Sequence, residues 1–186
     1  MENNNKTSVI VVHMDTQHDT SVMKAMYEGL ADTILLYNPT QLEFEDAMEK
    51  NPTADLIAIG HGNAYGLLNL TWDGYIICGA NADLLRGRER VVCVWCWAAD
   101  FARRNNLNGF YTSMFISNPE EAVMFGKDRR PFEVFDNQNM WLCDEVKSMW
   151  NEKTPMNEWV ERLRSRCNNS LDFVRYNYDG VTYLNG

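Results

Sequence analysis

Short, almost entirely apolar runs recur along the chain, and they restrict the fold more than any other feature of the sequence. The run from Val9 to Val12 is β-branched throughout, and Asp55–Gly60 and Arg90–Trp95 are similar runs. Strands that are apolar on every residue are buried on both faces, as in parallel sheets covered by helices. Shorter strands are expected at Thr33–Tyr37 and Phe110–Ile116. The pattern predicts an α/β fold of three layers, with a mainly parallel sheet and helices on both faces.

The segments between and after these runs carry helical spacing or turn signals. The expected helices are, in chain order, about Thr20–Ala31, Gln41–Lys50, Ala80–Leu85, Trp97–Asn105, a helix that begins after Asn118, Phe135–Trp150 and Thr154–Cys167. A small hairpin is expected between residues 63 and 78. Residues 171–184 alternate around Asp179-Gly180, which predicts a hairpin or an edge strand. We expect one domain, with a core over residues 7–125 and a helical portion over residues 131–186.

The charge and composition of the chain argue against nucleic acid and membranes as partners. The formal net charge is -9 and the pI is about 4.8, which disfavours binding to nucleic acid or to an anionic membrane. No run approaches the roughly 20 apolar residues of a membrane span, and residues 1–6 lack the order of a signal peptide. We therefore expect a cytosolic protein whose five cysteines are free thiols. The sequence gives no reason to expect a cofactor or a metal, because Cys93-x-x-Cys96 has no matching second pair.

Two chemically reactive side chains follow successive apolar runs. His61 comes directly after the run over residues 55–60, and Cys96 comes directly after the run over residues 90–95. Parallel sheets bind ligands at the carboxyl ends of their strands, so the two side chains are expected to share a cleft. An imidazole can take the proton of a thiol and activate it for attack on a carbonyl. Gly62 allows close approach of the backbone, and the Cys96 N–H is expected near a helix start, where donors are unpaired.

The two strand-end blocks carry a family resemblance. Residues 56–62 read Leu-Ile-Ala-Ile-Gly-His-Gly, and residues 91–96 read Val-Val-Cys-Val-Trp-Cys. This arrangement resembles the caspase-like cysteine peptidases, a group that includes caspases, metacaspases, legumains, gingipains and clostripains, over roughly residues 7–125. The resemblance implies that Cys96 is the nucleophile, His61 the general acid and base, and Gly62 an oxyanion-hole donor. It also implies a peptide or protein substrate and a substrate-binding loop after His61.

The sequence around Cys96 does not match a particular subfamily. It reads Val-Trp-Cys-Trp-Ala-Ala-Asp, whereas the caspase signature is Gln-Ala-Cys followed by a glycine two residues later. His61 and Cys96 are 35 positions apart (96 minus 61), against about 50 in caspases. The resemblance is therefore to the architecture and to the Cys96–His61 pair.

Several polar residues are candidates for substrate binding: Asn63, Tyr65, Asp100, Ser113 and Ser117. The first two lie in the loop after His61. Asp100, one helical turn after Cys96, could bind a basic substrate side chain or hold His61, although a surface acid is an equal interpretation. The two serines lie on or after the fifth strand, where the resemblance implies a specificity pocket. His13 and Asp15, at the end of the first strand, favour a structural interpretation.

Three functions remain open at this level. The first is a cysteine endopeptidase that uses Cys96 and His61. The second is a catalytically inactive member of the same fold that binds a ligand or a partner protein and regulates it. The third and weakest is nucleotide binding, since residues 14–18 after the first strand read Met-Asp-Thr-Gln-His rather than a glycine-rich phosphate loop.

Overall fold

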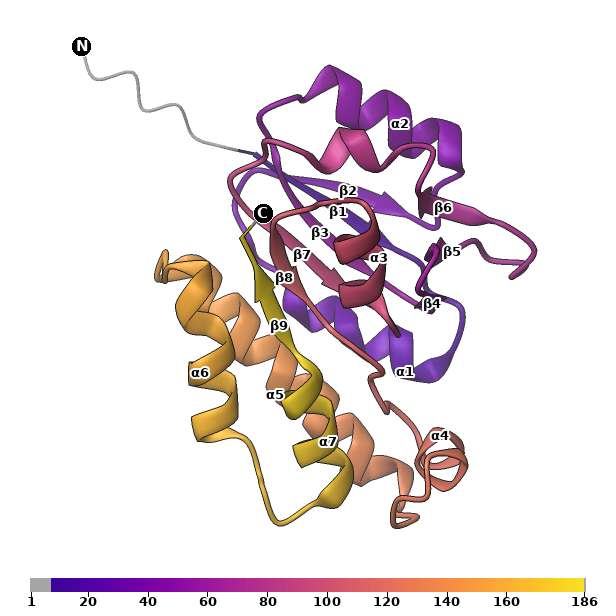
Figure 1. The fold of residues 1–186 in the computed structure, drawn as a ribbon, viewed down its shortest axis with the longest axis vertical. Coiled ribbons are helices and arrows are strands. Elements are labelled where there is room, and N and C mark those ends of the chain that lie inside the picture. The colour runs from indigo at the N-terminus through magenta and orange to yellow at the C-terminus, as the bar shows by residue number, and fades with distance from the viewer. Residues whose placement is uncertain (1–7, 186) are drawn as a thin grey trace.

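The computed structural model describes residues 8–185, and within them six strands form one sheet in the order β2-β1-β3-β7-β8-β9 (Figure 1). Thr7 and the polar residues 1–6, on which the signal-peptide prediction was based, lie outside this range. The strands that pair in parallel are β1 (Val9–His13), β2 (Thr33–Tyr37), β3 (Asp55–Ile59), β7 (Val91–Val94) and β8 (Gly109–Tyr111). The edge strand β9 (Thr182–Leu184) pairs with β8 in the antiparallel direction.

Helices cover both faces of this sheet, which confirms the three-layer α/β prediction. One face packs against α2 (Gln41–Lys50), the short 3₁₀ segment η2 (Ala82–Leu85) and α3 (Ala98–Arg104). The other packs against the 3₁₀ segment η1 (Val22–Met26), α5 (Phe132–Asn151), α6 (Met156–Arg166) and α7 (Asp172–Gly180). Alternate residues of β1, β3 and β7 enter opposite cores, as strand geometry requires. None of the helices between residues 8 and 185 is long and apolar enough to cross a membrane.

The first crossover differs from the predicted helix over residues 20–31. The structure has a short helix α1 (His18–Ser21), followed at once by η1 and then by turns up to β2. The hydroxyls of Thr20 and Ser21 both donate to the Gln17 carbonyl, and such local bonds compete with helical ones. Gly29 then adopts a φ of 85°, a left-handed conformation that ends helices. The segment is therefore compact but not one regular helix.

The predicted strand over residues 110–116 is also shorter than expected. β8 ends at Tyr111. The next residue, Thr112, still donates its N–H to the Cys93 carbonyl at 3.2 Å, and its side chain adds two bonds to the Trp95 backbone. Its hydroxyl accepts from the Trp95 N–H at 3.1 Å and donates to the Trp95 carbonyl at 2.7 Å. Residues 112–118 then leave the sheet as an irregular segment that leads to α4 (Pro119–Met124), whose cap is the predicted Asn118.

The predicted hairpin around Asp179-Gly180 is wrong, whereas the predicted edge strand is present as β9. The segment before it forms α7, which buries Phe173, Val174, Asn177 and Tyr178. These four positions lie on one face of a helix. The alternation of apolar and polar residues over 171–184 nevertheless resembles that of a strand, which led to the hairpin prediction. Where α7 ends, the Arg164 side chain donates to the carbonyls of residues 178, 179 and 181.

A small three-stranded antiparallel sheet that contains the predicted hairpin follows β3. Its strands are β4 (Gly62–Asn63), β5 (Gly66–Leu68) and β6 (Tyr75–Cys78), in the order β4-β5-β6. At Gly66 a side chain would place its Cβ 1.9 Å from the Ile77 carbonyl oxygen, so only glycine fits. The Leu68 N–H donates to the His61 carbonyl at 2.9 Å, and the hairpin thereby fixes the backbone at His61.

Candidate functional site

His61 and Cys96 follow two adjacent strands, as the sequence predicts. β3 and β7 pair directly, with Ile59 opposite Val94, and each candidate side chain lies two residues beyond its strand. Both residues line a cavity of about 640 Å³ and a smaller inner cavity of about 20 Å³. The expectation of one shared cleft at the carboxyl ends of the strands is therefore confirmed.

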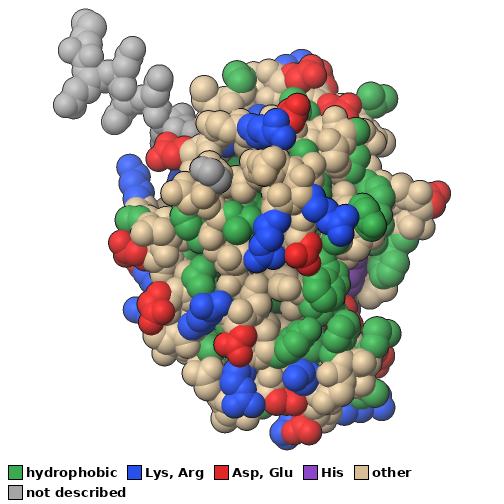
Figure 2. Space-filling model, viewed as in Figure 1, with side chains coloured by type: hydrophobic (Ala, Val, Ile, Leu, Met, Phe, Trp, Pro, Cys, Tyr) green, Lys and Arg blue, Asp and Glu red, His purple; other side chains and the backbone are tan. Residues whose placement is uncertain are grey.

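The larger cavity combines an apolar wall with acidic groups. Its apolar lining residues are Leu68, Trp72, Trp97, Met114, Met124, Phe125 and Phe132. Its acids are Asp19, Glu120 and Glu121, and no Lys or Arg is among the described residues that line it. On the face shown in Figure 2, hydrophobic side chains gather along the right-hand flank, where the outline is indented and histidine atoms are visible. The cavity thus favours ligands that are apolar, cationic or both.

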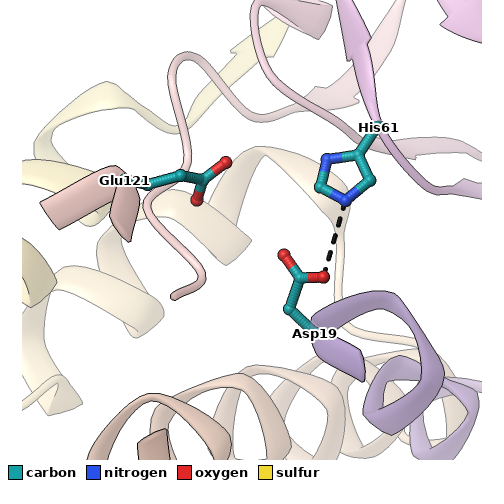
Figure 3. Close-up of side chains that lie close together, drawn as sticks. All are labelled: Asp19, His61 and Glu121. Carbon is teal, nitrogen blue, oxygen red and sulfur yellow. Dashed lines mark ion pairs between the residues drawn. The ribbon is translucent and has the colours of Figure 1, made fainter. Parts of the chain in front are cut away.

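The imidazole of His61 faces a carboxylate that the sequence analysis did not select. His61 Nε2 lies 3.5 Å from Asp19 Oδ1, and both side chains are largely withdrawn from solvent (Figure 3). That separation fits an ion pair, while Nε2 has no hydrogen-bond partner of good geometry. Burial opposes the charge of His61, but the Asp19 carboxylate outweighs it and raises the pKa of the imidazole. The ring of Trp72 covers His61, with ring centres 5.1 Å apart.

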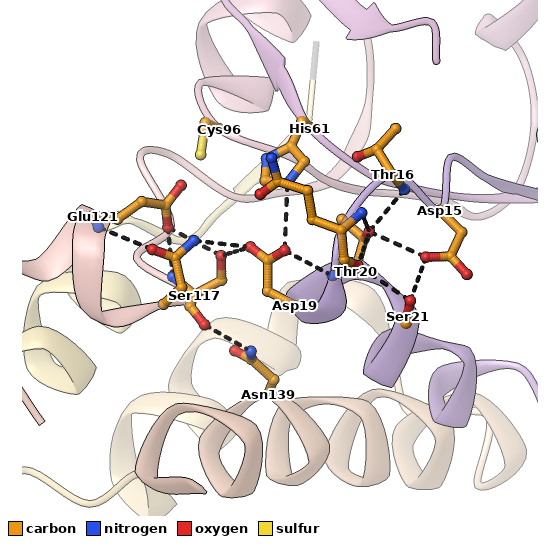
Figure 4. A network of polar contacts seen from close by, with 12 residues as sticks. Asp15, Thr16, Asp19, Thr20, Ser21, His61, Cys96, Ser117, Glu121 and Asn139 are labelled. Atoms are coloured by element: carbon orange, nitrogen blue, oxygen red, sulfur yellow. Dashed lines mark hydrogen bonds and ion pairs between the residues drawn. The ribbon is translucent and has the colours of Figure 1, made fainter. Parts of the chain in front are cut away.

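Asp19 is held by a network from three parts of the chain (Figure 4). Its Oδ2 accepts from the Ser117 hydroxyl at 2.5 Å and from Asn118 Nδ2 at 3.1 Å. Its Oδ1 accepts from the Thr20 N–H at 3.1 Å. Burial raises the pKa of Asp19, but these bonds and the neighbouring His61 prevail and hold it at about 2. Asp19 is therefore a fixed negative charge at neutral pH.

Glu121 adds a second carboxylate to the same network. Its Oε2 accepts from the Ser117 N–H at 2.8 Å and lies 3.0 Å from the Ser117 hydroxyl. Burial and the negative charge of Asp19 raise the pKa of Glu121, against the hydrogen bonds from Ser117. The ligand atoms of Asp19, His61 and Glu121 all lie within 4.8 Å of one another. These three residues could therefore hold a metal ion.

The thiol of Cys96 is protonated in this arrangement. Its Sγ donates to the Phe115 carbonyl at 3.5 Å, and within residues 8–185 no hydrogen bond joins it to His61. Burial, together with the charge of Glu121, raises the pKa of the thiol to about 12. The next residue, Trp97, has a φ of 68°, which is uncommon outside glycine. This turn separates Cys96 from α3, so the Cys96 N–H lies before the helix rather than at its first residue.

The remaining predicted site residues divide into two groups. Gly62 and Asn63 line the large cavity, and Ser117 lines the inner one. A Cβ on Gly62 would lie 2.3 Å from the Trp95 ring, which gives this glycine a packing role.

The other three predicted residues are not among those that line either cavity. Asp100 pairs with Arg103 at 3.1 Å, and Tyr65 is exposed beneath the guanidinium of Arg104. The Ser113 carbonyl accepts the Trp97 N–H at 3.1 Å.

The functional residues that sequence reasoning missed share one signal. Asp19 lies in the segment after β1, and Glu121 lies in α4, which follows β8. The rule that places ligands at the carboxyl ends of parallel strands applies to all four inner strands of the sheet. At the ends of the first and fifth predicted strands it points to His13, Asp15, Ser113 and Ser117, whereas the two acids lie a few residues further along the chain. Extending it would have brought both acids into consideration.

Comparison with known proteins adds no family to this description. Neither a scan against protein-family models nor a search of the curated proteins gives a match to this chain.

Proposed function

We propose that the protein is a cysteine hydrolase that cleaves peptide bonds by acyl transfer, with Cys96 as nucleophile and His61 as general acid and base. The observation that carries the proposal is that both side chains line one cavity at the ends of two paired strands. The resemblance of the two strand-end blocks to caspase-like peptidases supports it. As part of the proposal, we place the enzyme in the cytosol, where thiols stay reduced.

Asp19 gives His61 an orienting partner. Because His61 Nε2 faces Asp19, Nδ1 is left for the thiol. In Figure 3 the other ring nitrogen faces the side on which Glu121 lies, and Figure 4 shows Cys96 on that side as well. A carboxylate that pairs with one imidazole nitrogen fixes the ring and stabilises the imidazolium formed during proton transfer. Asp19 is therefore proposed as a positioning residue.

The reaction proceeds in two steps. His61 takes the proton of the Cys96 thiol as the sulfur bonds to the substrate carbonyl carbon, and it returns that proton to the amine as the C–N bond breaks. Water then attacks the thioester, gives a proton to His61, and the thiolate leaves and is reprotonated. Gly62 remains the proposed oxyanion-hole donor. The acids that line the cavity favour a cationic substrate side chain, a role that Glu120 can fill in place of Asp100.

A thiol-directed activity probe tests the Cys96–His61 pair. We expect the probe to label Cys96, identified by peptide mass spectrometry, and we expect His61→Ala to slow labelling by about 100-fold or more, since general-base assistance contributes that much. Cys78→Ala is the matched control, because Cys78 is also a half-buried free thiol, and it should label as wild type does. Equal rates for wild type and His61→Ala would overturn the proposal.

A non-catalytic binding module is the second candidate, and one observation favours it. The Cys96 thiol donates to the Phe115 carbonyl and has a pKa near 12, as an unreactive structural cysteine would. On this alternative the cavity binds a ligand or peptide, and Cys96→Ala leaves binding unchanged. In the probe experiment, Cys96 would then react no faster than Cys78.

A further inference from the structure

We infer that Asp19, His61 and Glu121 form a binding site for a divalent transition-metal ion of the Zn²⁺ class at the base of the large cavity. The three residues come from α1, from the segment after β3 and from α4, so the fold, rather than a local motif, brings them together. The inference does not require Cys96 to be catalytic.

The separations fit a metal after small adjustments. Zn–N and Zn–O bonds of about 2.1 Å at tetrahedral angles place ligand atoms about 3.4 Å apart. His61 Nε2 and Asp19 Oδ1 are 3.5 Å apart, which is long for a hydrogen bond but matches one edge of such a tetrahedron. The ligand atoms of all three residues lie within 4.8 Å of one another. The longest separation between two of these atoms must therefore shorten by at most about 1.4 Å, which rotation of the side chains can supply.

The nitrogen that would bind the metal has no hydrogen-bond partner. His61 Nε2 is buried and faces Asp19 Oδ1 at 3.5 Å without the geometry of a hydrogen bond, although buried polar atoms are nearly always hydrogen-bonded and leaving one without such a bond is costly. The same atom points at Asp19. A metal between the two would accept the imidazole lone pair and remove this deficit.

The carboxylates carry the supporting contacts that metal ligands need. Ser117 binds both of them, and Asn118 donates to Asp19. Ser117 is itself fixed by Asn139, whose Nδ2 donates to the Ser117 carbonyl at 3.1 Å. Hydrogen bonds of this kind orient metal ligands and tune their affinity. They also hold two carboxylates close together in a site lined by no Lys or Arg among the described residues, and a divalent cation would compensate this charge.

The donor set selects the class of ion. Mg²⁺ and Ca²⁺ prefer ligand sets made of oxygen alone, whereas an imidazole with carboxylates suits Zn²⁺ and its transition-metal neighbours. Three protein ligands leave a further coordination position, and the cavity gives it access. If the proposed function also holds, Zn²⁺ inhibits the hydrolase. The metal would bind between His61 and Asp19 and so replace the direct interaction by which Asp19 positions the imidazole.

Calorimetric titration of the purified protein with Zn²⁺ tests the site. The absorbance spectrum of the protein with Co²⁺ bound in place of Zn²⁺ reports the coordination geometry. We expect one Zn²⁺ bound with an affinity that Glu121→Gln and His61→Gln each lower by at least about tenfold, and we expect no binding of Mg²⁺ at the same concentration. Glu120→Gln is the matched control, since Glu120 lines the same cavity outside the cluster. Far-UV circular dichroism confirms that each variant is folded. Unchanged affinity in both ligand variants would overturn the inference, as would an equal effect of Glu120→Gln.

Cys96→Ala separates this inference from the proposed function. The variant should bind Zn²⁺ as wild type does while losing all probe labelling at that position. If Cys96→Ala abolished Zn²⁺ binding while Glu121→Gln kept it, the metal would sit on the thiol, and the inferred site would be wrong. Loss of activity without any change in Zn²⁺ affinity leaves the metal site intact.

Discussion

His13 illustrates how burial decides the chemistry of one residue. It ends β1, is 1% exposed, and uses both ring nitrogens. Nε2 lies 2.9 Å from the Thr20 carbonyl, which can only accept, so Nε2 carries the proton. Nδ1 then accepts from the Tyr27 hydroxyl at 2.8 Å. Both nitrogens of the neutral ring therefore have hydrogen-bond partners. Burial lowers the pKa of His13, and it outweighs the hydrogen bond to Thr20 and the charge of Asp15, which raise it.

His13 and His18 should therefore titrate at different pH values. We expect the pKa of His13 to lie below 6.5, and the pKa of His18 to lie above it because of its hydrogen bond to Asp136. Ring-proton chemical shifts followed by NMR across pH 4–9 measure both. Asp136→Asn is the control: it should lower the pKa of His18 and leave that of His13 unchanged. A His13 pKa above 6.5 would contradict the prediction.

The same shift has a consequence for stability. The folded pKa of His13 lies below its unfolded value of about 6.5, so the unfolded chain takes up the proton first. The stabilising contribution of neutral His13 is therefore fully present above about pH 6.5 and is lost as the pH falls below that value.

At this scale the sequence predicts the pair His61 and Cys96 but not the acids around them. The pair follows from local apolar runs and from one rule about parallel sheets. Asp19 and Glu121 reach the site because α1, the 112–118 segment and α4 adopt conformations set by contacts beyond the sequence around each acid. The bond from the Ser117 hydroxyl to Asp19, 98 residues away along the chain, shows that dependence, whereas Ser117 is only four residues from Glu121.

Among the elements, α7 has an effect beyond its own packing. Asn177 is buried, its Oδ1 accepts from the Ile116 N–H, and its Nδ2 donates to the Ile116 carbonyl, each at 2.8 Å. This pair of bonds fixes the irregular segment directly before Ser117. The helix therefore helps to hold the residue that binds Asp19 and Glu121.

Removing the Asn177 amide should weaken both the fold and the site. We expect Asn177→Ala to lower the free energy of unfolding by about 2–4 kcal/mol, because two buried backbone groups lose their partners. Zn²⁺ affinity, if the inferred site is present, should fall as well. Urea denaturation measures the first effect and calorimetry the second. Asn157→Ala, at an exposed position of α6, is the control and should change stability by less than about 0.5 kcal/mol. Equal effects of the two substitutions would contradict this role of α7.

Elements were predictable where their signals are local. β2 and α2 begin and end at the predicted residues, since Thr40 caps α2 and a polar turn separates the two. The α1–η1 segment was not predicted, because the side chains of Thr20 and Ser21 form hydrogen bonds that interrupt the regular helix. The helix α7 was not predicted either, because its sequence alternates like a strand although its buried residues share one helical face. β8 was predicted to extend to Ile116, but the chain leaves the sheet after Thr112, whose hydroxyl bonds to the Trp95 backbone.

In the whole molecule, one of the two cores joins the sheet to the later helices. Phe110 of β8 packs on Trp159 of α6, with ring centres 5.7 Å apart, and Trp159 packs on Trp150 of α5, with ring centres 6.4 Å apart. Val9, Ile57 and Val92 belong to the same buried cluster. The residues predicted as the core and as the helical portion therefore form a continuous interior, in keeping with a single domain.

Unfolding should accordingly occur in one cooperative transition. We expect Trp159→Ala to lower the free energy of unfolding by about 3–5 kcal/mol, with tryptophan fluorescence and far-UV circular dichroism shifting together in urea. Trp72→Ala, which removes a half-exposed ring, should change it by less than about 1 kcal/mol. Two separated transitions in either protein would show that the helical portion unfolds on its own.

The supports of Ser117 also determine when the site can come into being. Asn139 and Asn177 both bind the segment around Ser117, and they are made on the ribosome after Asp19, His61, Cys96 and Glu121. A nascent chain that already carries all four of these residues still lacks the bonds that hold them in register. The arrangement of these four side chains that the structure describes is therefore complete only after residue 177 has been synthesised.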